Sequence, residues 1–256
     1  MNWNPTWICP ANDLGDPAAV FGTSFVFEKK ITHANLTITA MGVYEARLNG
    51  RRVGQFVMAP GWTSYHKRLQ YQEYDITDLL TNGKNEIEVT VGKGWYRSPL
   101  PGWLGCAYQD ELRSRPCGLA AQITLTFEDG SSKILSTDES WKVSDGPVRF
   151  SEIYDGEIYD SAKTPLLDQP VTIFDGPTDT LILQQGEEVC EQERLAVKKV
   201  FVTPNGETVL DFGQNMTGYV ELFVNAKAGD CVDLSFAEVM DKEGNFYTEN
   251  YRGAKA

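Results

Sequence analysis

The chain has 256 residues, of which 41% are hydrophobic and 23% are charged, and its formal net charge at pH 7 is −13. This composition is typical of globular proteins, and a chain of this length can bury a sizeable core without disulfides or metal ions. The excess of Asp and Glu, 36 against 23 Lys and Arg, argues against nucleic acid and membrane surfaces as partners, because those bind proteins that neutralise phosphates. A neutral sugar or another small molecule remains compatible with the acidic balance.

The N-terminus and the cysteines indicate the cellular compartment. Residues 1–10 lack a basic start, a long apolar run and a small-residue cleavage site, so they do not resemble a signal peptide. No stretch reaches the roughly 18 apolar residues of a membrane-spanning helix. The five cysteines are odd in number and form no C-x-x-C pair: Cys9, Cys106, Cys117, Cys190 and Cys231. They indicate neither a disulfide framework nor a thiolate zinc site, and we expect a cytoplasmic protein.

Apolar residues alternate with polar ones along most of the chain, as in strands with one buried face. The alternation is clearest in four segments: 86–91, 121–127, 220–224 and 232–236. Asn49-Gly50 and Asp129-Gly130 predict tight hairpins, because these residues tolerate positive φ angles. Only 75–80 looks helical, as a single capped turn. Frequent turn signals without long helices predict an all-β protein, with a jelly-roll β-sandwich followed by a second β-sandwich.

A domain boundary is expected close to residue 165. Pro165 and Pro170 flank a segment without clean alternation, and the turn-forming residues 175–177 follow it. The predicted domains are therefore a jelly roll over 1–165 and a second β-sandwich over 166–256. The second domain would hold about 90 residues, which is short for a complete sandwich, so we expect it to be incomplete.

Aromatic residues gather in three glycine-rich stretches, at 61–65, 94–97 and 101–103. Exposed tryptophan and tyrosine rings can stack on the apolar C–H faces of sugars. The competing interpretation is that these rings fill the ends of the sandwich, and the usual burial of aromatic residues slightly favours it.

The segment 151–160 carries four carboxylates and two tyrosines around one glycine. A glycosidase needs two carboxylates that flank the glycosidic bond, and the four in this segment are Glu152, Asp155, Glu157 and Asp160. The same groups could bind calcium, accept hydrogen bonds from sugar hydroxyls, or protect a strand edge from aggregation. Contact with a ligand or an ion is favoured over catalysis.

Other catalytic signatures are missing from the sequence. It contains no H-E-x-x-H, P-loop, dinucleotide fingerprint or EF-hand loop. The only histidines, His33 and His66, have no G-x-S-x-G partner, so Ser-His-Asp hydrolysis has little support.

A series of motifs runs along nearly the whole chain in a fixed order. The motifs are W-I-C-P at 7–10, A-M-G-V-Y-E at 40–45, L-N-G-R-R-V-G at 48–54, P-G-W-T-S-Y at 60–65, G-K-G-W-Y-R at 92–97, G-E-I-Y-D at 156–160, L-D-F-G-Q-N-M-T-G at 210–218 and Y-T-E-N at 247–250. Taken together they resemble the N-terminal, non-catalytic region of bacterial α-L-rhamnosidases, an inverting glycoside hydrolase family.

The resemblance implies an architecture and an activity for the parent protein. In the family, an accessory jelly roll and a second β-sandwich precede an (α/α)6 barrel that carries the catalytic carboxylates. The parent enzyme would hydrolyse terminal α-L-rhamnosides, with one carboxylic acid protonating the leaving oxygen and another activating water. This chain would end within the second sandwich, before the barrel. We therefore assign no catalytic residue, and we do not expect the chain to be catalytic by itself.

The resemblance also implies a candidate sugar site. The family's first jelly roll resembles a carbohydrate-binding module, which in some members binds L-rhamnose with calcium. The candidates for ring stacking are Trp95, Tyr96 and Trp103. The candidates for contact with hydroxyls or an ion are Asp155, Glu157, Tyr159 and Asp160. The implied partners are a rhamnose-containing oligosaccharide or glycoside and the catalytic barrel of the same polypeptide, with calcium as a candidate cofactor.

Three hypotheses remain. The first is an accessory region that recognises rhamnose, and the second is a structural scaffold without a ligand site. The third is a β-sandwich glycosidase that uses two carboxylates of the segment 151–160. Exposure of the candidate aromatic rings beside Asp155 or Glu157 separates the first two, because buried rings would favour the scaffold.

Overall fold

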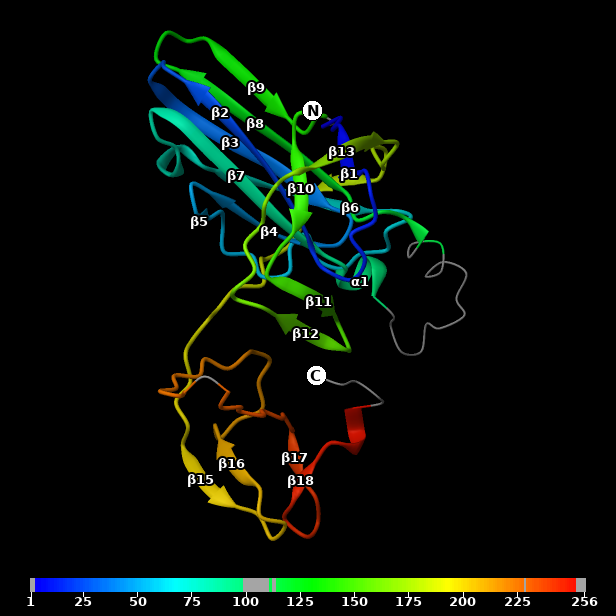
Figure 1. Cartoon of the computed structure of the whole chain (residues 1–256), viewed down its shortest axis with the longest axis vertical. Coiled ribbons are helices and arrows are strands. Elements are labelled where there is room, and N and C mark those ends of the chain that lie inside the picture. Colours follow the sequence, from blue (N-terminus) through cyan, green and yellow to red (C-terminus); the bar gives the residue numbers. More distant parts are fainter. Residues whose placement is uncertain (1–2, 99–110, 112–113, 228, 252–256) are drawn as a thin grey trace. The chain divides into compact units, whose positions relative to one another are not determined.

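A computed structural model describes residues 3–98, 111, 114–227 and 229–251. In these residues the structure is nearly all β, which confirms the predicted fold class (Figure 1). The chain divides into two compact units between Glu191 and Gln192. None of the described helices combines the length and the apolar character needed to cross a membrane.

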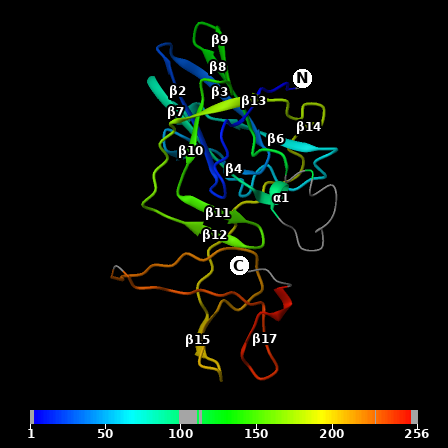
Figure 2. The ribbon, with the colours of Figure 1, turned by 45° about the vertical axis from the view of Figure 1, so that its right-hand side comes forward.

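The first unit is a β-sandwich. Its strands are β1 (Trp7–Pro10), β2 (Ala19–Phe27), β3 (Ile31–Ala40), β4 (Val43–Leu48), β5 (Arg51–Arg52), β6 (Leu69–Asp75), β7 (Gly83–Gly92), β8 (Leu119–Phe127), β9 (Ser132–Ser136), β10 (Lys142–Asp145), β11 (Val148–Glu152), β12 (Gly156–Tyr159), β13 (Gln169–Phe174) and β14 (Leu181–Leu183). Among the helices that can be bounded in the described residues of this unit are η1 (Thr77–Leu79) and α1 (Gly94–Arg97). The antiparallel order β6-β3-β8-β1 forms one group and β10-β2-β7-β4-β5 the other, while β9 pairs with β8 and β14 joins β6 in parallel (Figures 1 and 2).

The core of this unit is formed by the apolar residues of the strands that the alternation predicted. In β7, Ile87 and Val89 are buried while Glu86 and Glu88 are exposed. Successive side chains of a strand point to opposite faces, so one face is apolar and packs inward. One apolar cluster contains buried residues of both groups of strands: Phe21, Leu36, Ile38, Ile87, Val89, Ile123 and Leu125.

Both predicted hairpins are confirmed. Asn49 and Gly50 have φ angles of 52° and 76° and connect β4 to β5, as a two-residue turn with two positive φ angles requires. Asp129 and Gly130 lie in the turn between β8 and β9, where the Gly130 amide donates to the Phe127 carbonyl. The predicted helical turn is η1.

The unit boundary differs from the expected one. The strand β13 pairs with β1 from Trp7↔Phe174 to Pro10↔Val171, and it also pairs with β10 at Lys142↔Pro170. The segment that follows residue 165 is therefore part of the first sandwich: Pro165 lies in a loop of that sandwich and Pro170 lies in β13 itself. The first unit extends to Glu191, and a boundary after residue 165 would cut through its sheet.

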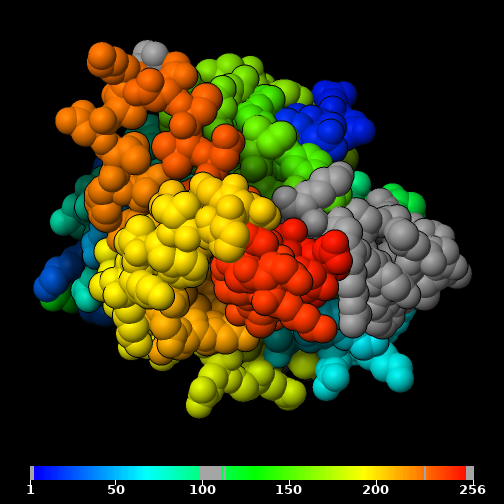
Figure 3. All heavy atoms as spheres, turned by 90° about the horizontal axis from the view of Figure 1, so that it is seen from below, coloured from blue at the N-terminus to red at the C-terminus, as the bar shows by residue number. Residues whose placement is uncertain are grey.

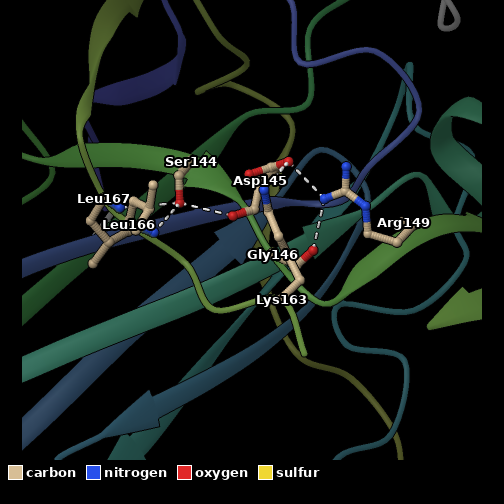
Figure 4. Close-up of polar contacts among 7 residues, drawn as sticks. All are labelled: Ser144, Asp145, Gly146, Arg149, Lys163, Leu166 and Leu167. Carbon is tan, nitrogen blue, oxygen red and sulfur yellow. Dashed lines mark hydrogen bonds and ion pairs between the residues drawn. The ribbon is translucent and has the colours of Figure 1, made fainter. Parts of the chain in front are cut away.

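A polar network ties residues 163–167 to the turn between β10 and β11 (Figure 4). The hydroxyl of Ser144 accepts hydrogen bonds from the backbone amides of Leu166 and Leu167, both at 3.1 Å. The carboxylate of Asp145 lies 2.7 Å from Arg149 and 3.3 Å from Lys163. This segment is held by specific bonds and is no free linker.

We expect Asp145→Asn to lower the free energy of unfolding by about 1 kcal/mol, as for a partly exposed ion-pair network. The hydrogen bond from Arg149, together with Lys163, lowers the pKa of Asp145 below its ordinary value of 3.8. The ion pairs of the Asp145 carboxylate therefore contribute fully to the free energy of unfolding above the ordinary pKa of 3.8. This contribution is lost as the pH falls through the lower pKa of the folded state. Denaturant unfolding at about pH 7 and about pH 3 should show the difference between variant and parent shrinking in acid.

The exposed Asp168 provides the control. Asp168→Asn should leave the stability unchanged at both pH values. An effect of Asp145→Asn that stayed constant down to the acid limit would contradict the ion-pair explanation.

The second unit contains two short hairpins among its described residues. They are β15 (Lys199–Val202) with β16 (Thr208–Asp211), and β17 (Val239–Met240) with β18 (Phe246–Tyr247), followed by η2 (Glu249–Tyr251). The hairpins lie side by side, yellow to orange and red in Figure 3, and the Asn205 amide donates to the side chain of Asn245 at 3.1 Å.

The segments 220–224 and 232–236 do not form the predicted strands. Within the described part of the second unit, neither is paired with another segment in a ladder. Their apolar side chains are exposed, with Phe223 at 83% and Leu222 at 48%. The alternation is present, but a strand also needs a neighbour that accepts and donates its backbone hydrogen bonds.

Candidate functional site

The helical turn α1 carries two of the candidate stacking residues, at the end of β7. Gly94 has a φ of 53°, and a Cβ atom there would lie 2.5 Å from Cγ1 of Val43. Only glycine therefore lets the chain turn this close to β4. The turn places Trp95 and Tyr96 in very different surroundings.

Tyr96 is part of the core. Its exposed fraction is 2%, and its ring meets the ring of Tyr65 edge-on, with centroids 5.0 Å apart. The same cluster contains Trp7, Met41 and Leu69. A ring buried in this way has no face available for a sugar. The role of Tyr96 is to anchor α1 in the core.

Trp95 is half-buried and stacks on Trp62. The two indole rings are parallel within 5°, and their centroids are 6.1 Å apart. Trp62 is 54% exposed, so the pair reaches the surface through Trp62. The third candidate ring, Trp103, lies outside the described residues.

The hairpin of β11 and β12 carries the acidic candidates. Glu157, Tyr159 and Asp160 are exposed and Asp155 is half-buried. Glu157 and Tyr159 are two residues apart on β12, so they share one face of the hairpin. Asp160 caps the following turn, where its carboxylate accepts from the backbone amide of Ala162 at 3.0 Å.

A buried ion pair joins the base of α1 to this hairpin. Nζ of Lys93 lies 2.7 Å from Oε1 of Glu152 and 3.2 Å from Asp16, and the Glu152 side chain is only 7% exposed. Burial acts to lower the pKa of Lys93, but its hydrogen bonds with Glu152 and Asp16 outweigh this effect and raise the pKa overall. A second bond runs from the Ile153 amide to the hydroxyl of Ser98, at 3.3 Å.

The structure therefore brings the turn with Trp95 and the acidic hairpin to the same end of the sandwich (Figures 1 and 2). Glu152 has a structural role there, because its carboxylate is buried against an ammonium group. That removes one of the four carboxylates considered for catalysis.

A pocket of about 290 Å³ opens beside the ion pair. Its lining includes charged side chains of both signs and a thiol, among them those of Asp16, Lys93, Arg97, Arg115 and Cys117. Burial, the largest effect, raises the pKa of the Cys117 thiol, although Arg97 opposes it. None of the described sugar-site candidates lines this pocket, so the pocket is separate from the candidate sugar site.

The described residues do not provide a group of side chains that could enclose a calcium ion. Across residues 3–98, 111, 114–227 and 229–251, no three His, Cys, Asp or Glu side chains are grouped to hold a metal ion. Calcium takes six to eight oxygen ligands, usually with several carboxylates. The acidic hairpin thus does not fit the ion by its described side chains alone, and calcium stays a prediction.

The two units match two known families. Residues 29–193 match the α-L-rhamnosidase N-terminal domain, and residues 201–256 match the bacterial α-L-rhamnosidase concanavalin-like domain. The chain belongs to the α-L-rhamnosidase family. The motif resemblance is thereby confirmed, and the limits of the first match agree with a unit that extends beyond residue 165.

Individual α-L-rhamnosidases support this assignment. The enzyme of Streptomyces avermitilis is 37% identical over 239 residues, which cover 89% of this chain and 23% of that protein. One from Formosa agariphila is 34% identical over 244 residues, covering 91% and 26%. The chain spans about a quarter of the length of these relatives.

Solved α-L-rhamnosidase structures share the fold. The native enzyme of Aspergillus terreus aligns over 82% of this chain and 26% of its own, with 37% identity and a TM-score of 0.75. The S. avermitilis enzyme complexed with L-rhamnose aligns over 93% and 24%, with 33% identity and a TM-score of 0.79.

Two features of the site could not be predicted from the sequence. Trp62 lies in one of the aromatic stretches, but nothing in the sequence pairs it with Trp95. The partnership of Lys93 and Glu152 joins residues 59 positions apart, and only the fold brings them together.

Proposed function

We propose that this accessory region of the α-L-rhamnosidase family recognises rhamnose-containing glycans for a parent enzyme that hydrolyses terminal α-L-rhamnosides. One observation carries the proposal. The ion pair of Lys93 and Glu152 holds the turn that bears Trp95 against the hairpin that bears Asp155, Glu157 and Tyr159.

The chemistry of this arrangement suits a sugar. Aromatic rings pack against the apolar C–H face of a pyranose, and exposed carboxylates accept hydrogen bonds from its hydroxyl groups. The polar side chains of the hairpin and its end are the half-buried carboxylate of Asp155, the exposed carboxylates of Glu157 and Asp160, and the exposed hydroxyl group of Tyr159. Hydrolysis itself is assigned to a catalytic barrel in the same polypeptide, with one carboxylic acid and one carboxylate as catalysts.

A calorimetric titration of the chain with L-rhamnose tests the proposal. We expect saturable binding that Trp95→Ala and Asp155→Ala each weaken about tenfold or more, since each removes a direct or supporting contact. Asp168→Asn is the matched control and should bind as the parent does. Absence of heat from a chain shown to be folded would contradict sugar recognition.

Calcium is tested in the same titration. If the ion completes the sugar site, a chelator should weaken binding and added calcium should restore it. Equal binding with chelator and with calcium would remove the ion from the proposal.

A cytoplasmic location of the protein also stays a prediction.

The alternative function is a structural scaffold without a ligand site of its own. The burial of Tyr96 favours it, because one of the three expected stacking rings is core. The scaffold hypothesis predicts that no substitution on the acidic hairpin changes the affinity of the parent enzyme for rhamnosides.

A further inference from the structure

Asparagine precedes glycine at Asn49, Asn82 and Asn205. Asparagine is one of the thermolabile residues of proteins. It loses its side-chain amide when the backbone nitrogen of the next residue attacks its Cγ atom, and glycine favours this attack because it has no Cβ atom in the way. All three asparagines have the same following residue, so their surroundings decide which of them reacts.

Hydrogen bonds hold the side chain of Asn49 in place. Its Oδ1 atom accepts from the Glu86 amide at 3.0 Å. Its Nδ2 atom donates to the Leu79 carbonyl at 2.9 Å and to Oδ1 of Asn85 at 2.8 Å. Asn85 is completely buried. The side chain of Asn49 must leave all these partners before it can turn toward the Gly50 nitrogen, so attack is suppressed.

Asn82 is restrained through its neighbour. Its side chain is exposed, and none of the described residues bonds to it. Gly83, however, is the first residue of β7 and pairs with Phe27 in the long ladder between β2 and β7. The attacking nitrogen is therefore part of the main sheet, and the end of that ladder must fray before the reaction.

Asn205 lies in the turn between β15 and β16. The Gly206 amide donates to the Thr203 carbonyl at 2.9 Å, and Gly206 has a φ of 89°. The side chain of Asn205 is exposed, and across the described part of the chain no group bonds to it. The backbone amide of Asn205 is held by the side chain of Asn245.

This turn closes a short hairpin. Its ladder runs only from Lys199↔Asp211 to Val202↔Thr208, and among the described residues no further strand pairs with it. A two-stranded hairpin is marginally stable by itself. Opening the turn therefore costs little free energy and releases the Gly206 nitrogen from its hydrogen bond.

We propose that Asn205 is a site of spontaneous deamidation. The Gly206 nitrogen forms a bond to Cγ of Asn205, and the side-chain NH2 group leaves with the proton of the Gly206 amide as ammonia. The product is a cyclic succinimide. Water then opens this ring at one of its two carbonyl groups, which leaves aspartate or isoaspartate at position 205. Water is the only co-reactant, and no electrons are exchanged.

The reaction changes the hairpin as well as the charge. Each product adds one carboxylate to a chain that is already acidic. In isoaspartate the main chain passes through the former side chain and is longer by one carbon atom. This extra atom falls between Thr203 and Gly206, so the hydrogen bond that closes the turn cannot keep its geometry.

The test is incubation of the full chain at mildly alkaline pH, followed by peptide mapping with mass spectrometry. Enzymatic methylation of the new carboxylate identifies isoaspartate. In the folded chain, Asn205 should convert about tenfold or more faster than Asn49, because a peripheral hairpin opens more readily than a core strand. Asn82 should lie between them. In concentrated urea the three rates should become similar, since each asparagine is followed by glycine.

A variant of Thr203 tests the role of the turn. The Thr203 hydroxyl accepts from the Glu207 amide at 3.1 Å and also bonds to the Glu207 carboxylate. Thr203→Val removes both bonds, so conversion at Asn205 should become faster while conversion at Asn82 stays the same. Asn82 is thus the internal control.

Two outcomes would overturn the proposal. One is conversion at Asn205 that is as slow as at Asn49 in the folded chain. The other is an order of rates that persists in urea, because the local sequence and not the fold would then decide it. Should Thr203→Val unfold the hairpin, the comparison of the folded parent with the parent in urea still gives the answer.

Discussion

A polypeptide that ends at Glu191 should unfold cooperatively, whereas one that ends at residue 165 should not fold. The shorter chain lacks β13, which pairs with both β1 and β10 and so connects the two groups of strands. It also lacks Phe174, whose ring packs against Trp7, and the Pro177 carbonyl that accepts from the Trp7 indole at 2.9 Å. Trp7 is 2% exposed in the intact unit, and losing the burial of a tryptophan costs about 3–5 kcal/mol by itself.

Thermal unfolding followed by circular dichroism, with amide exchange of β1, compares the two polypeptides. Protected β1 amides and a sharp transition are expected only for the chain that ends at Glu191. A matched point variant, Trp7→Ala, should destabilise the full chain by about 4 kcal/mol, while Trp62→Ala should have little effect. If the chain ending at residue 165 melted like the longer one, the first unit would end there after all.

Lys93→Met should lower the free energy of unfolding of the first unit by about 3 kcal/mol, because it leaves the carboxylate of Glu152 buried without a counter-ion. The Lys93 side chain is 20% exposed and that of Glu152 only 7%, so water cannot replace the lost partner. At about 2–4 °C per kcal/mol for a unit of this size, the melting temperature should fall by roughly 6–12 °C.

The pH dependence follows from the raised pKa of Lys93. A lysine whose folded pKa lies above its ordinary value of 10.5 contributes stability that is fully present below that value. The contribution is lost as the pH rises through the folded pKa. The difference between Lys93→Met and its parent should therefore be constant at neutral pH and shrink only in strong alkali.

The exposed pair of Lys29 and Asp129 is the control for this ion pair. Their side chains are 57% and 52% exposed, so Lys29→Met should cost less than about 1 kcal/mol. Replacing Lys93 and Glu152 together by Met and Gln should cost less than the sum of the single changes, because the two groups interact directly. An effect of Lys93→Met as small as that of Lys29→Met would show that the pair is solvated in solution.

Local patterns were sufficient to predict the class of fold. The alternation at 86–91 and 121–127 identified β7 and β8, and Asn49-Gly50 and Asp129-Gly130 identified two turns. These features depend on the side-chain period of a strand and on the φ angles of two neighbouring residues, so a few positions contain the information. The order of motifs likewise identified the family without any knowledge of contacts.

Patterns of the same kind failed where a partner strand decides the outcome. Residues 220–224 alternate as clearly as β7, but in the described part of the second unit they do not pair in a ladder. Prolines near residue 165 indicated a linker, but β13 pairs with a strand more than 160 positions earlier. Pairing over such a distance is set by the whole sheet, and local composition does not encode it.

For the candidate site, the sequence by itself determined which residues could contact a sugar, since Trp, Tyr and carboxylate groups carry that chemistry wherever they lie. Only the tertiary structure decided which of them can do so. Tyr96 and Trp95 are adjacent in the chain, yet core packing buries the first and α1 holds the second beneath the exposed ring of Trp62. Burial depends on what packs around a side chain, and those neighbours come from distant strands and loops.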